Sequence, residues 1–282
     1  MPKRLSLSVL FLTVVLISCK TDFEVNDKWK EINIVYCLLD KDDSVHYVRV
    51  EKAFQNADQS AYTIAQNMDS LYNQDSLTVT MLETKNGITT REITLEKIFS
   101  NDKDSGMFAY PGQFLYRTPG IVTLDPSANY TIDVKDNKTG LESHGSTDIV
   151  NDIHPGFPNH NASTINFQPY TSTTFYFNAG DGAKFYNMEL DIHYTEYAGK
   201  DTTAPATQME IVWPIFTNYS LTETTGETEI KRVVLGSEFF QLLHAHIPVN
   251  EDVVRKFRNV TIKISSGGTE IYNYIQVYTP SI

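Results

Sequence analysis

Hydrophobic and polar residues alternate with a period of two over much of the first half of the chain, as expected for strands that bury one face. In residues 45–53, valines alternate with polar or charged neighbours. Residues 77–81 repeat the pattern and lead to Asn86-Gly87, a dipeptide that readily supplies the two positive φ angles of a type I′ turn. We therefore expect a β-hairpin at this turn, with residues 88–99 as the partner strand.

Other stretches complete the first half. Residues 32–39 form an almost continuous apolar run of strand length, in which Cys37 is expected to be a buried thiol that acts as a small hydrophobe. Apolar residues recur at intervals of three and four in 57–71, which predicts one short helix packed on a sheet. Residues 101–119 predict a loop, and short strands are expected at 121–124, 130–134 and 141–150.

The segment 151–158 has no periodicity and contains two prolines and a glycine, so we expect a domain boundary there. Beyond it, apolar and polar residues alternate strictly from 185 to 197, which predicts a strand with one buried and one wet face. Residues 209–215 alternate in the same way, and Pro214 favours an edge strand or a bulge.

The last part of the chain predicts a helix and a hairpin. Ser237 has the character of a helix cap, and the helix should end before Pro248. Residues 260–264 and 271–277 then predict a hairpin around Gly267-Gly268. Together these elements predict a mainly β protein with two β-sandwich domains of the immunoglobulin or fibronectin type, at 31–150 and 151–282, with one short helix each.

A different pattern occupies the start of the chain. Lys3 and Arg4 precede an apolar run from Leu5 to Ile17. This run is too short to cross a bilayer, which takes about 20 residues, and it has the order of a secretory signal peptide. We therefore expect residues 1–18 to be a signal peptide and residues 19–30 to be a polar tether.

The sequence Leu16-Ile17-Ser18-Cys19 resembles a bacterial lipobox. The resemblance implies cleavage before Cys19, and attachment of diacylglycerol and an amide-linked acyl chain such as palmitate to that residue. Two or more chains make such anchoring stable. Residues 20–24 are similar to the basic-then-acidic signal that sends some Bacteroidota lipoproteins to the cell surface. The alternative to a lipobox is a plain signal peptide with an incidental cysteine. The alternative to a surface-export signal at 20–24 is an ordinary solvated linker.

The expected mature chain is acidic. Loss of Lys3 and Arg4 leaves 21 basic residues against 35 acidic ones, a net charge of −14. Such a surface repels nucleic acid and anionic lipid headgroups. We therefore expect no nucleic-acid partner, and an outer-membrane anchor supplied by lipid. With Cys19 acylated, Cys37 has no partner for an intramolecular disulfide.

Several segments together resemble an uncharacterised family of Bacteroidota outer-membrane lipoproteins, built on a domain of unknown function. They cover most of the mature chain: the lipobox, Tyr36–Asp40, Tyr47–Phe54, Asp69–Tyr72, Gly106–Ala109, Phe185-Tyr186 and Tyr194–Tyr197. The resemblance implies a lipid-anchored protein of β-sandwiches, surface-exposed or periplasmic, associated with TonB-dependent transport.

Motifs of catalysis or cofactor binding are absent from the sequence, including His-Glu-x-x-His, Gly-x-Ser-x-Gly, the Walker loop and Cys-x-x-Cys. We therefore expect no enzymatic activity, no cofactor and no metal. The weighed metal candidates are expected to be surface or turn residues instead. They are His154, His160, His244, His246, and the acidic turns with Asp40, Asp42, Asp43, Asp102 and Asp104.

Three functions fit these observations. The first is a non-enzymatic accessory lipoprotein that engages an outer-membrane β-barrel protein, such as a TonB-dependent transporter, or an external ligand. Tyr170 and the run Phe175–Phe177 could supply its anchors. The second is a glycan-binding surface module that uses exposed tyrosines or Trp213 as stacking platforms. The third is a hydrolase with an interdomain site near His154 and His160.

Overall fold

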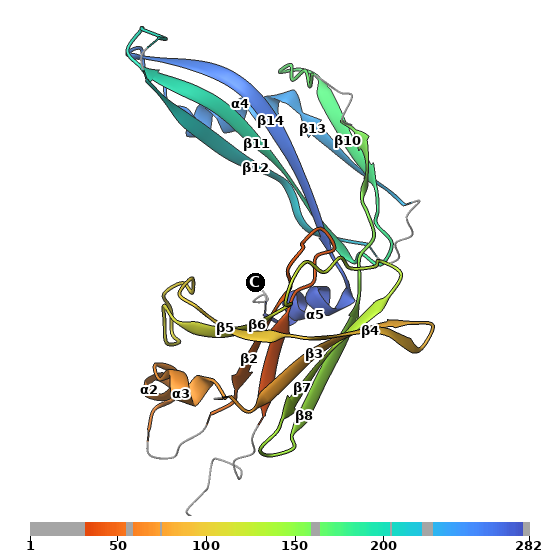
Figure 1. Ribbon diagram of the computed structural model, residues 1–282. Coiled ribbons are helices and arrows are strands. Elements are labelled where there is room, and N and C mark those ends of the chain that lie inside the picture. The colour runs from red at the N-terminus through yellow and green to blue at the C-terminus, as the bar shows by residue number, and fades with distance from the viewer. Residues whose placement is uncertain are drawn as a thin grey trace, which may run out of the picture. The chain divides into compact units, whose positions relative to one another are not determined.

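The protein is described by a computed structural model that covers residues 32–54, 59–73, 75–158, 164–203, 205–221 and 228–278. It is mainly β, with 50% of the described residues in strands and 13% in helices, and its strands form several open antiparallel sheets (Figure 1). Among the described residues, no helix combines the length and the apolar character needed to cross a membrane. The strand content and the antiparallel sheets confirm the predicted mainly β class.

The first sheet has the order β1-β2-β6-β5. Its strands are β1 (Asn33–Cys37), β2 (Tyr47–Lys52), β6 (Gln113–Arg117) and β5 (Glu96–Ser100). The prediction of a loop throughout 101–119 is wrong, because β6 lies within it and pairs with β2 through Tyr47 and Arg117. The glycines and prolines that indicated a loop all lie outside β6.

Two short helices replace the single helix predicted for 57–71. They are α2 (Ala61–Ala65) and α3 (Met68–Leu71). Asn67 separates them: it has extended backbone angles, and its side chain accepts a hydrogen bond from the Asp69 amide, which caps α3. An asparagine cap marks the start of a helix, so α2 ends before Asn67 and α3 begins after it. The apolar residues keep the predicted spacing of three and four across this break. Ile64, Ala65 and Leu71 are buried.

A second sheet has the order β4-β3-β7-β8. Its strands are β4 (Ile88–Thr94), β3 (Leu77–Lys85), β7 (Asn129–Asp136) and β8 (Glu142–Asp148). The predicted turn is confirmed, since Asn86 and Gly87 have φ angles of 51° and 75° and join β3 to β4. The strands expected at 130–134 and 141–150 are confirmed as β7 and β8.

The predicted strand at 121–124 is wrong, although buried and exposed residues alternate in this segment. Val122 and Leu124 are buried, whereas Ile121 is 82% exposed. The Val122 amide donates to the Ser44 carbonyl over 2.8 Å. The segment therefore buries one face as a strand would, without joining a sheet.

Two three-stranded sheets follow, with the orders β13-β10-β9 and β12-β11-β14. The first contains β13 (Glu229–Leu235), β10 (Ser172–Asn178) and β9 (His154–Phe157), and the second β12 (Ala206–Ser220), β11 (Phe185–Ala198) and β14 (Val253–Gly267). β9 lies inside the segment 151–158, where the sequence predicts a domain boundary. One core cluster draws Phe175 and Phe177 from β10, Leu190 from β11 and Ile230 from β13, so both sheets share it.

β11 lies between β12 and β14, paired along its whole length (Figure 1). Its predicted buried face is confirmed, with Tyr186, Met188 and Leu190 at most 2% exposed. The prediction for Pro214 is confirmed too, because β12 is an edge strand and its register shifts beside that residue. On the face expected to be wet, Asp191 and Thr195 are exceptions, with 1% and 7% exposure.

The predicted helix near Ser237 is α4 (Gly236–His246). It begins one residue earlier, with Leu235 as N-cap and no side-chain cap, so the predicted capping role of Ser237 is wrong. Phe239, Leu242 and Leu243 pack against a small buried cluster on β11 and β12. α4 therefore covers part of the apolar face of the β12-β11-β14 sheet.

The predicted strand at 271–277 is wrong, because α5 (Thr269–Tyr278) occupies this stretch. Ile271 and Ile275 are four residues apart, which is the spacing of one helix face. Gly267 does not form a turn: it pairs with Phe185, and a Cβ atom there would lie 2.4 Å from the Phe185 ring. β14 therefore ends at Gly267, and α5 begins directly after Gly268.

Candidate functional site

The predicted lipidation residue Cys19, the tether at 19–30 and His160 lie outside the described residues. Cys37 is described, and the prediction that it is buried is wrong: it is exposed, on a strand at the edge of its sheet. Desolvation nevertheless raises the pKa of its thiol to about 12. The thiol therefore stays protonated at neutral pH, which disfavours reactivity.

The predicted surface histidines are exposed in the structure. His154 lies on β9, and His244 and His246 lie on α4. His246 bonds through Nδ1 to the Leu242 carbonyl of its own helix, 3.0 Å away. These three histidines belong to no group of three metal-ligating side chains among the described residues.

The acidic turns behave as local structure. The Asp42 amide donates to Asp40 Oδ1 over 3.0 Å, and the Asp102 amide donates to the Ser100 hydroxyl over 3.1 Å. Asp43 and Asp104 are exposed. Within the described ranges, none of these aspartates belongs to a cluster of potential metal ligands.

The aromatic residues predicted as anchors or stacking platforms differ in how exposed they are. Trp213 lies 6.1 Å from Phe167 and 6.0 Å from Phe239, between ring centroids, so it is part of an aromatic cluster and not a free platform. Phe175 and Phe177 are buried core residues, each 1% exposed. Tyr170 is fully exposed, and Tyr176 is 37% exposed on the other face of β10. Tyr170 is therefore the most exposed of these candidates.

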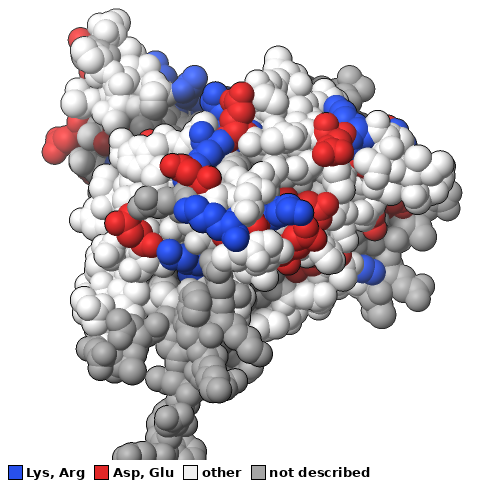
Figure 2. Space-filling model, turned by 60° about the horizontal axis from the view of Figure 1, so that its bottom comes forward, with Lys and Arg blue, Asp and Glu red and all other residues white. Residues whose placement is uncertain are grey.

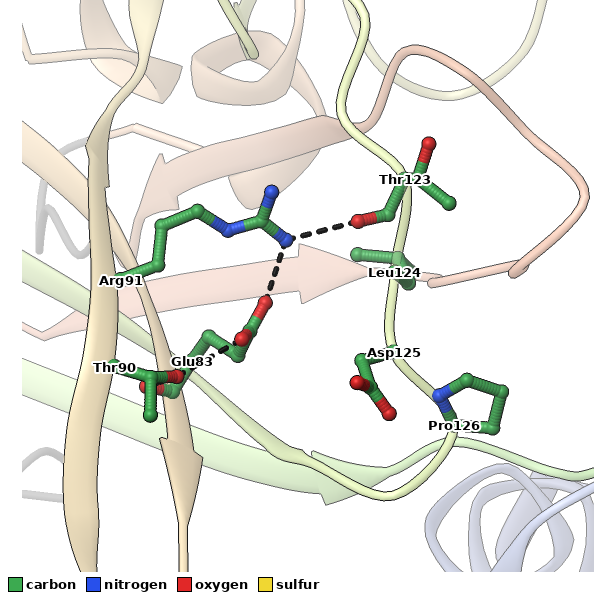
Figure 3. A pocket seen from close by; sticks show the side chains of 7 residues that line it. All are labelled: Glu83, Thr90, Arg91, Thr123, Leu124, Asp125 and Pro126. Carbon is green, nitrogen blue, oxygen red and sulfur yellow. Dashed lines mark hydrogen bonds and ion pairs between the residues drawn. The ribbon is translucent and has the colours of Figure 1, made fainter.

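An open pocket of about 550 Å³ lies beside the β3–β4 hairpin. Its lining comes from both hairpin strands and from the extended segment before β7: Glu83, Thr90, Arg91, Thr123, Leu124, Asp125 and Pro126. Figure 3 shows Arg91 reaching from its strand toward the segment that carries Thr123. This pocket is an open, polar candidate for binding a small ligand.

A β-bulge positions the polar groups of the pocket. Thr84 pairs with Thr89, but Glu83 pairs with Arg91, so Thr90 is the extra residue of the bulge. As a result, two neighbours reach one carboxylate. Thr90 donates to Glu83 Oε1 over 2.8 Å, and Arg91 donates to Glu83 Oε2 over 2.5 Å and to the Thr123 carbonyl over 2.9 Å (Figure 3).

Both carboxylates of the pocket are held in the ionised form. Burial would raise the pKa of Glu83, but hydrogen bonds from Thr90, Arg91 and Tyr130 outweigh it and lower the pKa. The bond from Lys85 is the main reason why the pKa of Asp125 lies far below its usual value. The pocket therefore offers hydrogen-bond acceptors and a guanidinium group, and neither carboxylate is suited to act as a general acid at neutral pH.

The sequence analysis missed Glu83, Arg91 and Asp125 as a group. A regular two-residue turn at Asn86-Gly87 would place Glu83 opposite Thr90, so the sequence does not predict the observed pairing of Glu83 with Arg91. The bulge that brings in Arg91, and the approach of Asp125 from a distant segment, leave no local signal.

Neither a protein-family model nor a curated protein sequence matches this chain. The functional assignment therefore depends on the residues and geometry described above.

Proposed function

We propose that this protein is a non-enzymatic lipoprotein of the bacterial outer membrane, anchored through lipid on Cys19, of the Bacteroidota lipoprotein type that its sequence resembles. The observation that carries the proposal is the order of basic residues, short apolar run and Leu16-Ile17-Ser18-Cys19. Cleavage before Cys19 releases residues 1–18 and leaves the tether at 19–30 between the membrane and the folded chain. Surface exposure is the orientation that we favour.

In this proposal the folded chain comprises two β-sandwich domains of the immunoglobulin or fibronectin type, at 31–150 and 151–282. For the second domain, support comes from the core cluster shared by the β13-β10-β9 and β12-β11-β14 sheets. Interdigitation of two inner sheet faces is the way that sandwiches are stabilised. For the first domain, support comes from its two four-stranded sheets.

The role that we propose is binding of an outer-membrane β-barrel protein, such as a TonB-dependent transporter. On the face drawn in Figure 2, basic and acidic groups lie side by side and no continuous basic surface is present. This mixture, together with a net charge of −14 for the mature chain, favours a lipid anchor over a basic membrane-binding patch. Exposed apolar side chains such as Ile121 and Val249, at 82% and 90%, are available for contacts.

Glycan binding is the second candidate, and one observation favours it. Tyr170 is 100% exposed, as an aromatic stacking platform requires. The ionised Glu83 and Asp125 of the pocket could also accept hydrogen bonds from sugar hydroxyl groups. Loss of binding to immobilised cell-surface glycans in the Tyr170→Ala variant would identify this activity, with Tyr186→Phe, which retains a buried ring, as a control.

The proposal is tested by purifying the native protein from outer membranes in mild detergent and identifying its companions by mass spectrometry. We expect a stoichiometric β-barrel protein with the wild type. The Cys19→Ser variant should leave the membrane fraction and lose that companion. Recovery of the lipidated protein alone would overturn the stable complex, and an unchanged membrane fraction for Cys19→Ser would overturn the anchor.

A further inference from the structure

Three potential metal ligands converge on the polar face of the β12-β11-β14 sheet. Asp191 and His193 are two residues apart on β11, so their side chains point to the same face. Glu210 on β12 is the direct cross-strand partner of His193. One ligand atom from each of the three lies within 4.8 Å of the others, and this is the one such group among the described residues.

The carboxylate of Asp191 is buried and has no hydrogen bond that would compensate its charge. Its residue is 1% exposed, and neither carboxylate oxygen makes a hydrogen bond of acceptable geometry. Lys263 Nζ lies 2.5 Å from Oδ2 as an ion pair, but the lysine side chain is 56% exposed and also lies 3.4 Å from Glu189. Because an ionised carboxylate is costly to bury without compensation, Asp191 depends on a partner that can move into solvent.

His193 is oriented as a ligand. Its Nε2 lies 3.1 Å from the Thr261 hydroxyl on β14, and its Nδ1 lies 3.9 Å from Glu210 Oε1. When Nε2–H donates to the hydroxyl, the lone pair of Nδ1 faces the carboxylates. A hydrogen bond from the distal ring nitrogen is the usual way in which proteins fix the tautomer of a metal-binding histidine.

We propose that Asp191, His193 and Glu210 form a binding site for a divalent transition-metal ion of the Zn²⁺ type. One imidazole nitrogen and two carboxylate oxygens supply three of the four ligands that Zn²⁺ usually takes, and water can supply the fourth. The imidazole favours Zn²⁺ over Mg²⁺ and Ca²⁺, which prefer all-oxygen sites. Without the ion, the ammonium group of Lys263 pairs with Asp191; when the ion binds, this group moves to Glu189.

Such an ion would join the middle strand β11 to the edge strand β12, at the point where the side chain of His193 meets that of Glu210. It would bind the folded chain and not the unfolded one, so it should raise thermal stability in proportion to the logarithm of its concentration. This site is independent of the lipid anchor and of the partner proposed above.

The test uses the untagged mature chain, with binding of Zn²⁺ measured by equilibrium dialysis and by titration calorimetry. We expect one ion per chain and weak or no binding of Mg²⁺ and Ca²⁺. His193→Gln should weaken binding at least tenfold, and Asp191→Asn should do the same. His244→Gln, which changes an exposed histidine of α4, is the matched control and should leave binding unchanged.

Lys263→Met separates a built site from casual surface binding. Since the ammonium group competes with the ion for Asp191, this variant should bind Zn²⁺ more tightly than the wild type, while circular dichroism verifies that it is folded. Thermal unfolding with Zn²⁺ should show a stabilising shift in the wild type and not in His193→Gln. Absence of binding at 1:1 stoichiometry, or equal affinity in His193→Gln and His244→Gln, would overturn the proposal.

Discussion

The ammonium group of Lys263 on β14 lies 2.5 Å from the carboxylate of Asp191 on β11, which is almost completely buried. The two residues occupy neighbouring strands, and Lys263 is the cross-strand partner of Glu189. The ion pair therefore joins adjacent positions on the polar face of one sheet. It explains how a carboxylate can be buried where the alternating sequence predicts a solvated side chain.

Removal of this ammonium group should destabilise the protein. Lys263→Met leaves Asp191 buried without a countercharge, so the midpoint of urea unfolding at pH 7 should fall. The double variant with Asp191→Asn should recover part of the loss, because the buried charge is then gone. A double-mutant cycle measures the coupling between the two residues, and a coupling of zero would contradict the role of the pair.

The same pair predicts a dependence on alkaline pH. Contact with Asp191 raises the pKa of Lys263 above its usual value of 10.5. A raised pKa in the folded state means that the stabilisation is fully present below pH 10.5 and is lost as the pH rises through the raised value. The difference in urea midpoint between wild type and Lys263→Met should therefore shrink above pH 10.5.

Asp136 at the end of β7 should stabilise the turn into β8. It is buried, and it accepts hydrogen bonds from the Ser76 hydroxyl and from the amides of Lys138 and Thr139. Asp136→Ala should lower the free energy of unfolding by at least about 1.5–3 kcal/mol, the value of one hydrogen bond to a charged group. Urea unfolding measures this loss, and an equal loss in Asp133→Ala, on the same strand, would contradict a specific role.

Asp136 also predicts a dependence on acidic pH. Burial alone would raise the pKa of its carboxyl, but the hydrogen bonds from Lys138, Thr139 and Ser76 lower it below the usual 3.8. A lowered pKa means that the stabilisation is present above pH 3.8 and disappears as the pH falls through the lowered value. The urea unfolding curves of wild type and Asp136→Ala should therefore converge as the pH falls below 3.8.

The hairpin turn should be sensitive to a single methyl group. Gly87 has φ of 75°, and a Cβ atom there meets nothing within 4 Å, so Gly87→Ala introduces only backbone strain. We expect a loss of about 1–2 kcal/mol, the cost of the left-handed conformation. Gly145→Ala on β8 also has open space but no positive φ, and it should be neutral or slightly stabilising. Equal effects of the two substitutions would contradict the turn.

The core shared by the two three-stranded sheets should respond strongly to truncation. Leu190 is 0% exposed, and Leu190→Ala should lower the free energy of unfolding by about 2–5 kcal/mol. Leu38→Ala makes the same chemical change at a residue that is 70% exposed, and its effect should stay within about 0.5 kcal/mol. Similar values for both leucines in denaturant titrations would contradict the packing of β11.

The parts of the fold that the sequence predicts well are those decided locally. Asn86-Gly87 determines its own turn, and the alternation along β11 directly reports which face is buried. The errors arise where the decision is made elsewhere in the chain. Cys37 lies in an apolar run that suggests a central strand, but the strand is at an edge, and Ile271 and Ile275 fit either a strand or a helix until Gly267 ends β14.

The candidate sites were harder to predict for the same reason. Glu83 and Arg91 come together through a bulge, and Asp125 reaches them from a segment with no regular structure. The buried carboxylate of Asp191 is paired with Lys263 on β14, a partner that the sequence of β11 does not reveal. In each case the residue types are ordinary, and their chemical meaning comes from partners far away in the sequence.

The measurement that tests the account most directly is the mass of the N-terminal peptide of the native protein, released by cleavage after Glu24. The account predicts a peptide that begins at Cys19 and carries diacylglycerol and an amide-linked acyl chain. A peptide that begins at another residue, or at Cys19 without lipid, would contradict the proposal of a lipid-anchored envelope protein.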